Sequence, residues 1–152
     1  MRFPWLMPLV VVAVADCRPL SADDSAALVE HRKIWDQAPH NAFTDLIRFR
    51  EHWFCVFREG QGHVSPDGAL RVITSTDGRT WDSAALLTSP NSDLRDAKIT
   101  VTPGGQLMLT GAEALHDKLR HTHQSLAWFS PDGRVWSDRH KIGDPNFWLW
   151  RV

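Results

Sequence analysis

A seven-residue stretch that occurs twice decides the fold. It reads Ser75-Thr76-Asp77-Gly78-Arg79-Thr80-Trp81 and recurs 55 residues later as Ser130-Pro131-Asp132-Gly133-Arg134-Val135-Trp136, with five of the seven positions identical. Each copy follows a segment rich in β-forming residues, at 70–74 and 125–129. Self-similarity at a fixed spacing indicates a repeated structural unit.

The segments around the two copies complete the unit. Apolar runs at 46–49 and 54–57 predict a hairpin, and those at 99–101 and 107–109 predict a second hairpin across the turn Pro103-Gly104-Gly105. A short apolar segment also follows each copy, at 86–87 and at 142. Four short antiparallel strands in about 50 residues are typical of one blade of a β-propeller.

A third unit is expected to begin near the end of the chain. Its signal is the segment 149–152, which aligns with 43–46 and 94–97 as the start of a first strand. The sequence therefore predicts an all-β chain whose residues 38–152 form about two blades and the start of a third. A propeller needs at least four blades to close, so we expect the chain to be a fragment.

The repeated residues suit a tight turn. An Asp carboxylate can accept backbone N–H groups inside a turn, and Gly can adopt a positive φ. The Trp that ends each copy is expected to bury its ring between adjacent sheets. We therefore assign a structural role to eight of the ten residues that the two copies share, which are Ser75, Asp77, Gly78, Trp81, Ser130, Asp132, Gly133 and Trp136.

The N-terminus has the pattern of a secretion signal. Arg2 precedes an apolar run at 6–14 and small residues of the kind found at cleavage sites, so residues 1–22 read as a signal peptide and linker, cleaved after Ala15 or Ala22. The run is shorter than the roughly 20 residues that span a bilayer, so no stable membrane insertion is expected. Secretion or a periplasmic location follows, with a buried N-terminal strand as the alternative reading. Cys17 raises a second alternative, a lipid anchor, which Asp16 before it disfavours.

Charge and cysteine content exclude other classes. The formal net charge is −1, so the chain lacks the basic field of a nucleic-acid-binding protein. Cys55 lies in an apolar run and is expected to pack as a small hydrophobic residue, with a disulfide to Cys17 left open. His121 and His123 are read as a polar strand or loop edge rather than a metal site. No zinc or calcium pattern occurs, so neither a metal nor a cofactor is predicted.

The two copies resemble the Asp boxes of the sialidase (neuraminidase) superfamily, whose pattern is Ser-x-Asp-x-Gly-x-Thr-Trp. Both copies here have one residue fewer between Asp and Gly. The resemblance covers residues 38–152 and implies a secreted, six-bladed sialidase-like propeller that hydrolyses glycosides in the manner of an exo-α-sialidase. Its ligand would be a carbohydrate.

The resemblance also implies where the site lies. Because the first strand of each blade lines the central channel, substrate-binding side chains are expected there. The candidates are Asp45, Arg95, Asp96, Trp150 and Arg151.

Three further residues follow the second strand of the first unit. Arg58 corresponds to a carboxylate-binding Arg of the family, and Asp67 falls in the region of its acid/base Asp. His63, in a Gly-rich loop, could also carry a proton. The family's nucleophile is a Tyr, and this chain contains no Tyr, so we expect the 152-residue chain itself to be inactive.

Each assignment has a plainer alternative. Arg95 and Asp96 could form an ordinary ion pair, Arg58 could be a solvated strand end, and Trp150 could serve packing. Asp67 lies in Ser65-Pro66-Asp67-Gly68, which is also a simple turn signature.

Three functions remain open at this point. The first is the sialidase-like hydrolase, and the second is a non-catalytic propeller that binds glycans or proteins. A third is a ring closed by several copies of the chain, which the extra segment 149–152 disfavours, so oligomerisation is not expected.

Overall fold

The structure, a computed structural model, describes residues 30–151, and residues from Arg32 onward form one compact unit. The predicted signal peptide and Cys17 lie outside the described residues. Eight strands follow one another along the chain: β1 (His40–Phe49), β2 (His52–Gly60), β3 (Ala69–Ser75), β4 (Asp82–Leu87), β5 (Ser92–Val101), β6 (Leu107–Leu115), β7 (His123–Ser130) and β8 (His140–Ile142). Within residues 30–151 no helix is long and apolar enough to cross a membrane.

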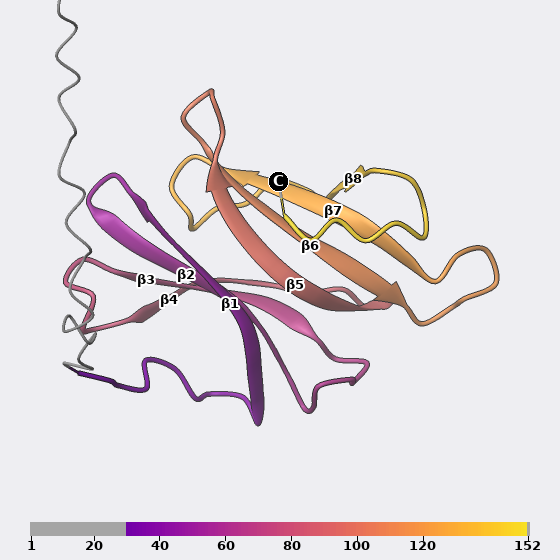
Figure 1. Ribbon diagram of the computed structural model, residues 1–152, viewed down its shortest axis with the longest axis horizontal. Coiled ribbons are helices and arrows are strands. Elements are labelled where there is room, and N and C mark those ends of the chain that lie inside the picture. The colour runs from indigo at the N-terminus through magenta and orange to yellow at the C-terminus, as the bar shows by residue number, and fades with distance from the viewer. Residues whose placement is uncertain (1–29, 152) are drawn as a thin grey trace, which may run out of the picture. The chain divides into compact units, whose positions relative to one another are not determined.

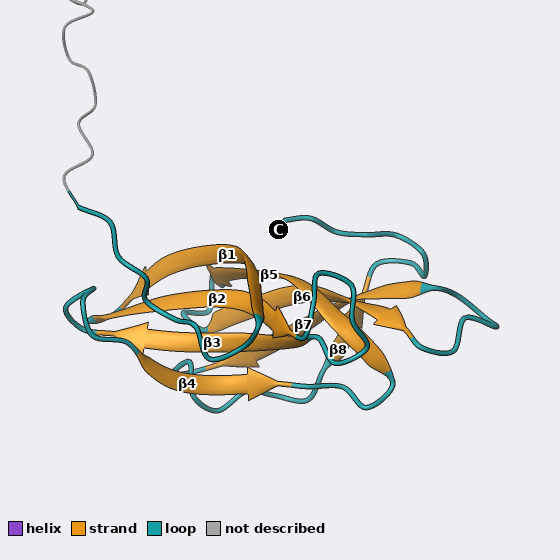
Figure 2. Ribbon diagram, turned by 90° about the horizontal axis from the view of Figure 1, so that it is seen from below, coloured by secondary structure: helices purple, strands orange, loops and turns teal. Residues whose placement is uncertain are grey.

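The strands form two antiparallel four-stranded sheets in simple chain order. The first sheet is β1-β2-β3-β4 and the second is β5-β6-β7-β8, as the repeat predicted. The second sheet packs on the first through β5, which contacts β1, β2 and β3 (Figures 1 and 2). The strand segments expected in the first two units lie within these strands, whereas the one expected at 149–152 does not.

The main core lies between the two sheets. Alternate residues of each strand point to the same face of a sheet, so every second apolar residue reaches this core. Its largest fully buried members include Leu70, Val72, Leu94, Leu109 and Leu126. Burial of such side chains contributes about 1.5–3 kcal/mol each, which makes the contact between the sheets the main source of stability.

The other face of the first sheet has a smaller core. Cys55, Phe57 and Ile73 are buried there, and Ile34 and Trp35 from the segment before β1 pack against them. Burial, with a smaller effect from the Asp45 carboxylate, raises the pKa of the Cys55 thiol to about 11. Cys55 therefore stays a neutral thiol at physiological pH and packs as the small hydrophobic residue that was expected.

The two repeated stretches form matching turns. Asp77 Oδ1 accepts hydrogen bonds from the backbone N–H groups of Arg79 (2.7 Å) and Thr80 (2.8 Å), and Gly78 has φ +69°. In the second copy Asp132 Oδ1 accepts from the two equivalent N–H groups at 2.9 and 3.0 Å, and Gly133 has φ +76°. The predicted turn chemistry is confirmed in both copies.

The Trp residues of the two turns pack on different surfaces. Trp136 packs against the core between the sheets, as predicted. Trp81 instead packs against Cys55, Phe57 and Ile73 on the other face of the first sheet. Each ring also donates its Nε1–H to the Gly carbonyl of its own turn, at 3.2 Å in Trp81 and 3.1 Å in Trp136.

The segment expected to start a third unit is not a strand. Residues 144–150 have neither strand nor bridge structure. A strand needs a ladder of backbone hydrogen bonds to a neighbouring strand, and these residues do not form such a ladder. The Ser125 hydroxyl holds this segment instead, donating to Phe147 O at 3.0 Å and accepting from Leu149 N at 3.0 Å. The segment still passes beside β5 and β1, where it contacts the site described below.

The turn carboxylates predict an acid-sensitive stability. Hydrogen bonds from Thr80 N, Arg79 N and Ser75 Oγ lower the pKa of Asp77 to about 2, below the ordinary value near 3.9 of an unfolded chain. A lowered folded pKa means that the stabilisation is present above about pH 4 and is lost as the pH falls toward 2. We expect Asp77→Asn to lower the melting temperature near pH 7 and to have almost no effect near pH 2, measured by thermal unfolding across this range.

A matched control for this prediction is Asp82→Asn, at an exposed position on β4 directly after the turn. Its effect on the melting temperature should be small at every pH. A loss in Asp77→Asn that is the same at pH 7 and pH 2 would show that the ionised carboxylate does not stabilise the turn.

Candidate functional site

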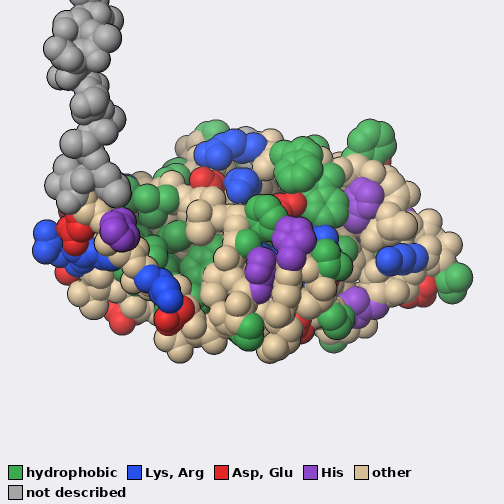
Figure 3. Space-filling view, turned by 60° about the horizontal axis from the view of Figure 1, so that its bottom comes forward, with side chains coloured by type: hydrophobic (Ala, Val, Ile, Leu, Met, Phe, Trp, Pro, Cys, Tyr) green, Lys and Arg blue, Asp and Glu red, His purple; other side chains and the backbone are tan. Residues whose placement is uncertain are grey.

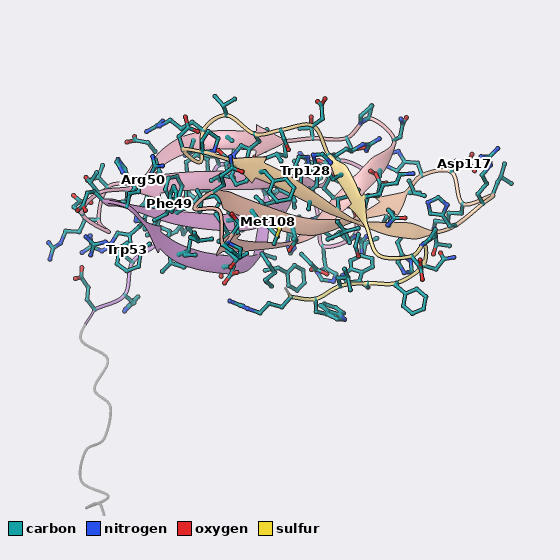
Figure 4. The ribbon with its side chains drawn as sticks, turned by 90° about the horizontal axis from the view of Figure 1, so that it is seen from above. Phe49, Arg50, Trp53, Met108, Asp117 and Trp128 are labelled. Carbon is teal, nitrogen blue, oxygen red and sulfur yellow. The ribbon has the colours of Figure 1, made fainter. Side chains whose placement is uncertain are left out.

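A pocket lies at the end of the sheets where β1 and β5 begin. Figure 4 marks the two ends, with Phe49 and Trp53 at one and Asp117 at the other. The antiparallel topology brings the β2–β3 and β6–β7 loops to the Asp117 end, where β1 and β5 also start. The pocket has a volume of about 360 Å³ and is lined by Phe43, His63, Arg95, Asp96, His123, Trp148 and Trp150. Figure 3 shows hydrophobic and His side chains gathered next to each other on one face of the molecule.

β-Bulges aim Phe43 and Asp96 at the pocket. The β1–β2 register shifts between Ala42 and Asp45, and the β5–β6 register shifts between Arg95 and Lys98. Phe43 (φ 61°) and Asp96 (φ 54°) occupy equivalent left-handed positions in these bulges. A bulge re-aims a side chain, and such strained residues cluster at functional sites. The equivalence also corrects the expected alignment, because it pairs Asp96 with Phe43 rather than with Asp45.

Asp96 is the carboxylate of the pocket. It is 7% exposed, and its Oδ2 accepts a hydrogen bond of 2.8 Å from Trp148 Nε1. Among residues 30–151 no donor bonds to the other oxygen, Oδ1. The bond from Trp148 therefore fixes the carboxylate and leaves Oδ1 to accept from a ligand.

Aromatic rings form the wall beside Asp96. The ring centroids of Trp148 and Trp150 are 6.1 Å apart, and those of Trp148 and His123 are 5.2 Å apart. Trp150 is 67% exposed, so a large apolar surface faces solvent at the pocket rim. Phe43 and His63, with ring centroids 5.6 Å apart, also line the pocket.

Arg95 supplies the positive charge of the pocket. Its Nε donates to Asp93 Oδ2 at 2.7 Å, and its Nη2 lies 2.6 Å from the same oxygen. The side chain keeps 24% of its surface exposed. Asp93 thus holds the guanidinium from one side, and the group can still bind a ligand from the other.

Arg58 lies behind Asp93 rather than in the pocket. Its side chain is 0% exposed, and its Nε and Nη2 donate to Asp93 Oδ1 at 3.0 and 2.8 Å. Its Nη1 donates to Gly62 O at 2.7 Å, and Nη2 also reaches the Ser65 hydroxyl at 3.0 Å. Arg58 therefore fixes the β2–β3 loop and the carboxylate that orients Arg95. Direct contact between Arg58 and a ligand stays a prediction. In the structure Arg58 is a positioning residue, because it holds Asp93, which in turn holds Arg95.

His63 is exposed on the β2–β3 loop and lines the pocket. Its ring meets His40 edge-on, with centroids 5.6 Å apart. The imidazole lines the same pocket as Trp148 and Trp150, where it could exchange a proton with a bound ligand.

Asp67 lies in the same loop but does not line the pocket. Its carboxylate accepts hydrogen bonds from the Gln61 backbone N–H at 3.1 and 3.3 Å. The side-chain hydrogen bond from Ser65, together with that from Gln61, lowers the pKa of Asp67. The lowered pKa keeps Asp67 ionised, which suits a carboxylate that accepts hydrogen bonds within a turn. The catalytic role of Asp67 remains a prediction.

Asp45 and Arg151 form an ion pair near the pocket. Arg151 Nη1 lies 3.6 Å from Asp45 Oδ1, and Asp45 Oδ2 accepts a hydrogen bond of 3.1 Å from Ile99 N. Asp45 thus joins β1, β5 and the C-terminal segment. Neither residue lines the pocket, so the structure places both of these predicted binding residues in a structural contact beside it.

Phe43, His123 and Trp148 are lining residues that the sequence-based prediction did not include. Trp148 had a usable signal, because residues two apart in an extended segment share a face and Trp150 was already a candidate. Phe43 had no such signal, since its position depends on the bulge. Among residues 30–151 no group of three or more His, Cys, Asp or Glu side chains is placed to hold a metal ion.

Comparison with known proteins supports the fold. No protein-family model and no curated protein sequence matches the chain. Among solved structures, the chain is similar to the GH32 β-fructofuranosidase BmSUC1 of Bombyx mori, with a TM-score of 0.51 and 12% sequence identity. A variant of the same enzyme in complex with sucrose matches equally well.

The similarity covers 70% of this chain and 25% of the enzyme, so the chain spans about a quarter of the length of its structural neighbour. At this identity the likeness concerns the fold. The two sheets resemble a fragment of the β-propeller of this glycoside hydrolase.

Proposed function

We propose that the chain is part of a carbohydrate-processing propeller of the glycoside hydrolase type, and that the pocket binds a sugar. The observation that carries the proposal is the fixed Asp96 carboxylate beside the Trp148–Trp150 wall. The likeness to a glycoside hydrolase fold supports it. The exported location expected from residues 1–22 would suit a protein that meets extracellular glycans.

The residues of the pocket match the chemistry of a sugar. A pyranose ring has apolar C–H faces, which pack on exposed aromatic rings such as Trp150. It also has hydroxyl groups that can donate to Asp96 Oδ1 and accept from Arg95. Ligand sites of this kind combine an apolar lining with a few fixed polar groups.

For the reaction we propose hydrolysis of an acidic sugar, as in an exo-α-sialidase. Arg95 supports this choice, because a guanidinium can pair with a sugar carboxylate through two hydrogen bonds. Most glycosidases use two carboxylates and sialidases use a Tyr nucleophile, whereas this pocket is lined within residues 30–151 by one carboxylate, Asp96, and the chain has no Tyr. The remaining catalytic groups would come from the rest of a longer protein.

A non-catalytic glycan-binding propeller is the second candidate. The single carboxylate of the pocket favours it. Turnover of aryl glycosides by the complete protein distinguishes the two, since only the hydrolase releases the aryl group. Absence of turnover on every acidic and neutral glycoside would exclude hydrolysis and leave binding.

The proposed binding of a sugar in the pocket predicts that Trp150→Ala weakens that binding. Because Trp150 is 67% exposed, we expect its loss to leave the fold intact and to weaken sugar binding about tenfold, which corresponds to about 1.4 kcal/mol. The measurement is titration calorimetry with the best glycan from an array screen of the 152-residue chain. Trp53→Phe, at the opposite end of the sheets, is the control and should bind like the wild type (Figure 4).

Asp96→Asn tests the polar half of the same pocket. The substitution removes the charge without changing the size of the side chain, and we expect weaker binding with little change in melting temperature. Unchanged affinity in both Trp150→Ala and Asp96→Asn would show that sugars bind elsewhere or not at all.

A further inference from the structure

A second hollow adjoins the pocket and shares Arg95 with it. Its volume is about 400 Å³. The β2–β3 loop forms one side, the end of β6 with the following loop forms the other, and Asp93 lies between them. The lining residues are Val64, Ser65, Pro66, Asp93, Arg95, Ala114, Leu115, His116 and Lys118.

The charge of this hollow is positive. Asp93 is its single carboxylate, and both oxygens of that carboxylate are already bound, Oδ1 by Arg58 and Oδ2 by Arg95. Lys118 is exposed, and no hydrogen bond or ion pair to its ammonium occurs among residues 30–151. The nearby Asp117 does not line the hollow and accepts a hydrogen bond from Leu119 N. Asp93 carries one negative charge and is shared by Arg58 and Arg95, so the two guanidinium groups together with Lys118 leave an excess of positive charge at the hollow.

His116 adds a polar group with a defined orientation. Its Nε2 lies 2.9 Å from Pro66 O. A carbonyl oxygen only accepts hydrogen bonds, so Nε2 carries the proton and donates. Nδ1 is then the ring nitrogen that remains for a ligand, and the contact holds the β6–β7 loop against the β2–β3 loop.

We propose that this hollow is an anion-binding subsite that selects glycans with a carboxylate or sulfate group next to the sugar held in the pocket. The inference rests on the proposed sugar binding and extends it from the acid of the bound sugar itself to an acidic group that lies outside the pocket, at the hollow. Arg95 lies on both surfaces, so a single ligand can place its sugar ring against Trp148 and its acidic group between Arg95 and Lys118. Carboxylate and sulfate both accept charge-assisted hydrogen bonds of the kind that these side chains donate.

The test uses glycans that share one core and differ in charge. The 152-residue chain is screened against an array that presents each core as its neutral, carboxylated and sulfated forms, and affinities are then measured by calorimetry on the best core. We expect the acidic forms to bind about tenfold more tightly than the neutral form, with the advantage falling as sodium chloride rises from roughly 0.05 to 0.5 M. The carboxylated and sulfated arms show which acid is preferred.

The control isolates Lys118. Lys118→Gln should reduce the affinity for the acidic form about fivefold and leave the neutral form unchanged, whereas Lys141→Gln removes the same charge from an exposed position on β8 and should change neither. Equal binding of neutral and acidic glycans would overturn the subsite while sugar binding stands. Failure of every glycan to bind would overturn both.

Discussion

Asp93→Asn is expected to lower the free energy of unfolding by about 3–5 kcal/mol, because it leaves Arg58 as a buried cation without its counter-ion. The Arg58 side chain is 0% exposed and that of Asp93 is 5% exposed, so water cannot replace the lost charge. Urea unfolding followed by tryptophan fluorescence measures the change. The same variant should weaken ligand binding, since Asp93 also orients Arg95.

An exposed ion pair provides the control for Asp93. Glu51→Gln breaks the pair between Arg48 and Glu51, whose side chains are 56% and 89% exposed, and should cost less than about 1 kcal/mol. Adding Arg58→Met to Asp93→Asn removes the stranded cation, so the double variant should be more stable than the sum of the two single losses predicts. Additive losses would mean that the loop acceptors around Arg58, such as Gly62 O, stabilise its charge without Asp93.

The strands and turns could be predicted from the sequence because their causes are local. Apolar runs bounded by Gly, Pro and Asp specify short strands, and Asp77 and Asp132 form the same turn because each carboxylate meets N–H groups two and three residues ahead. The order of the strands followed from the repeat. These features need no knowledge of distant contacts.

The site could be predicted only in part because its geometry depends on distant contacts and on bulges. Arg95, Asp96, Trp150 and His63 were expected and do line one pocket. The expected alignment of the first strands was shifted by two residues, because hydrophobicity does not reveal a bulge. Arg58 is an example of a long-range effect, since its partner Asp93 is 35 residues away and the pairing places its charge inside the protein.

Gly133→Ala should be strongly destabilising, because it combines backbone strain with a steric clash. Gly133 has φ +76°, where a residue with a Cβ is disfavoured by about 1–2 kcal/mol. A Cβ at this position would also lie 2.2 Å from the Phe54 ring in the core between the sheets. Overpacking of a core costs about a further 1–3 kcal/mol, so we expect a total loss near 2–5 kcal/mol in urea unfolding.

Gly78 separates these two causes, because it holds the equivalent place in the first turn. Its φ is +69°, yet a Cβ there would meet nothing within 4 Å. Gly78→Ala should therefore lose only the backbone contribution of about 1–2 kcal/mol. Combining Gly133→Ala with Phe54→Leu should recover part of the excess, since the smaller side chain makes room for the methyl group. Equal losses in the two Gly variants would show that the Phe54 ring moves aside freely, and that the second turn does not hold the second sheet against the first through this contact.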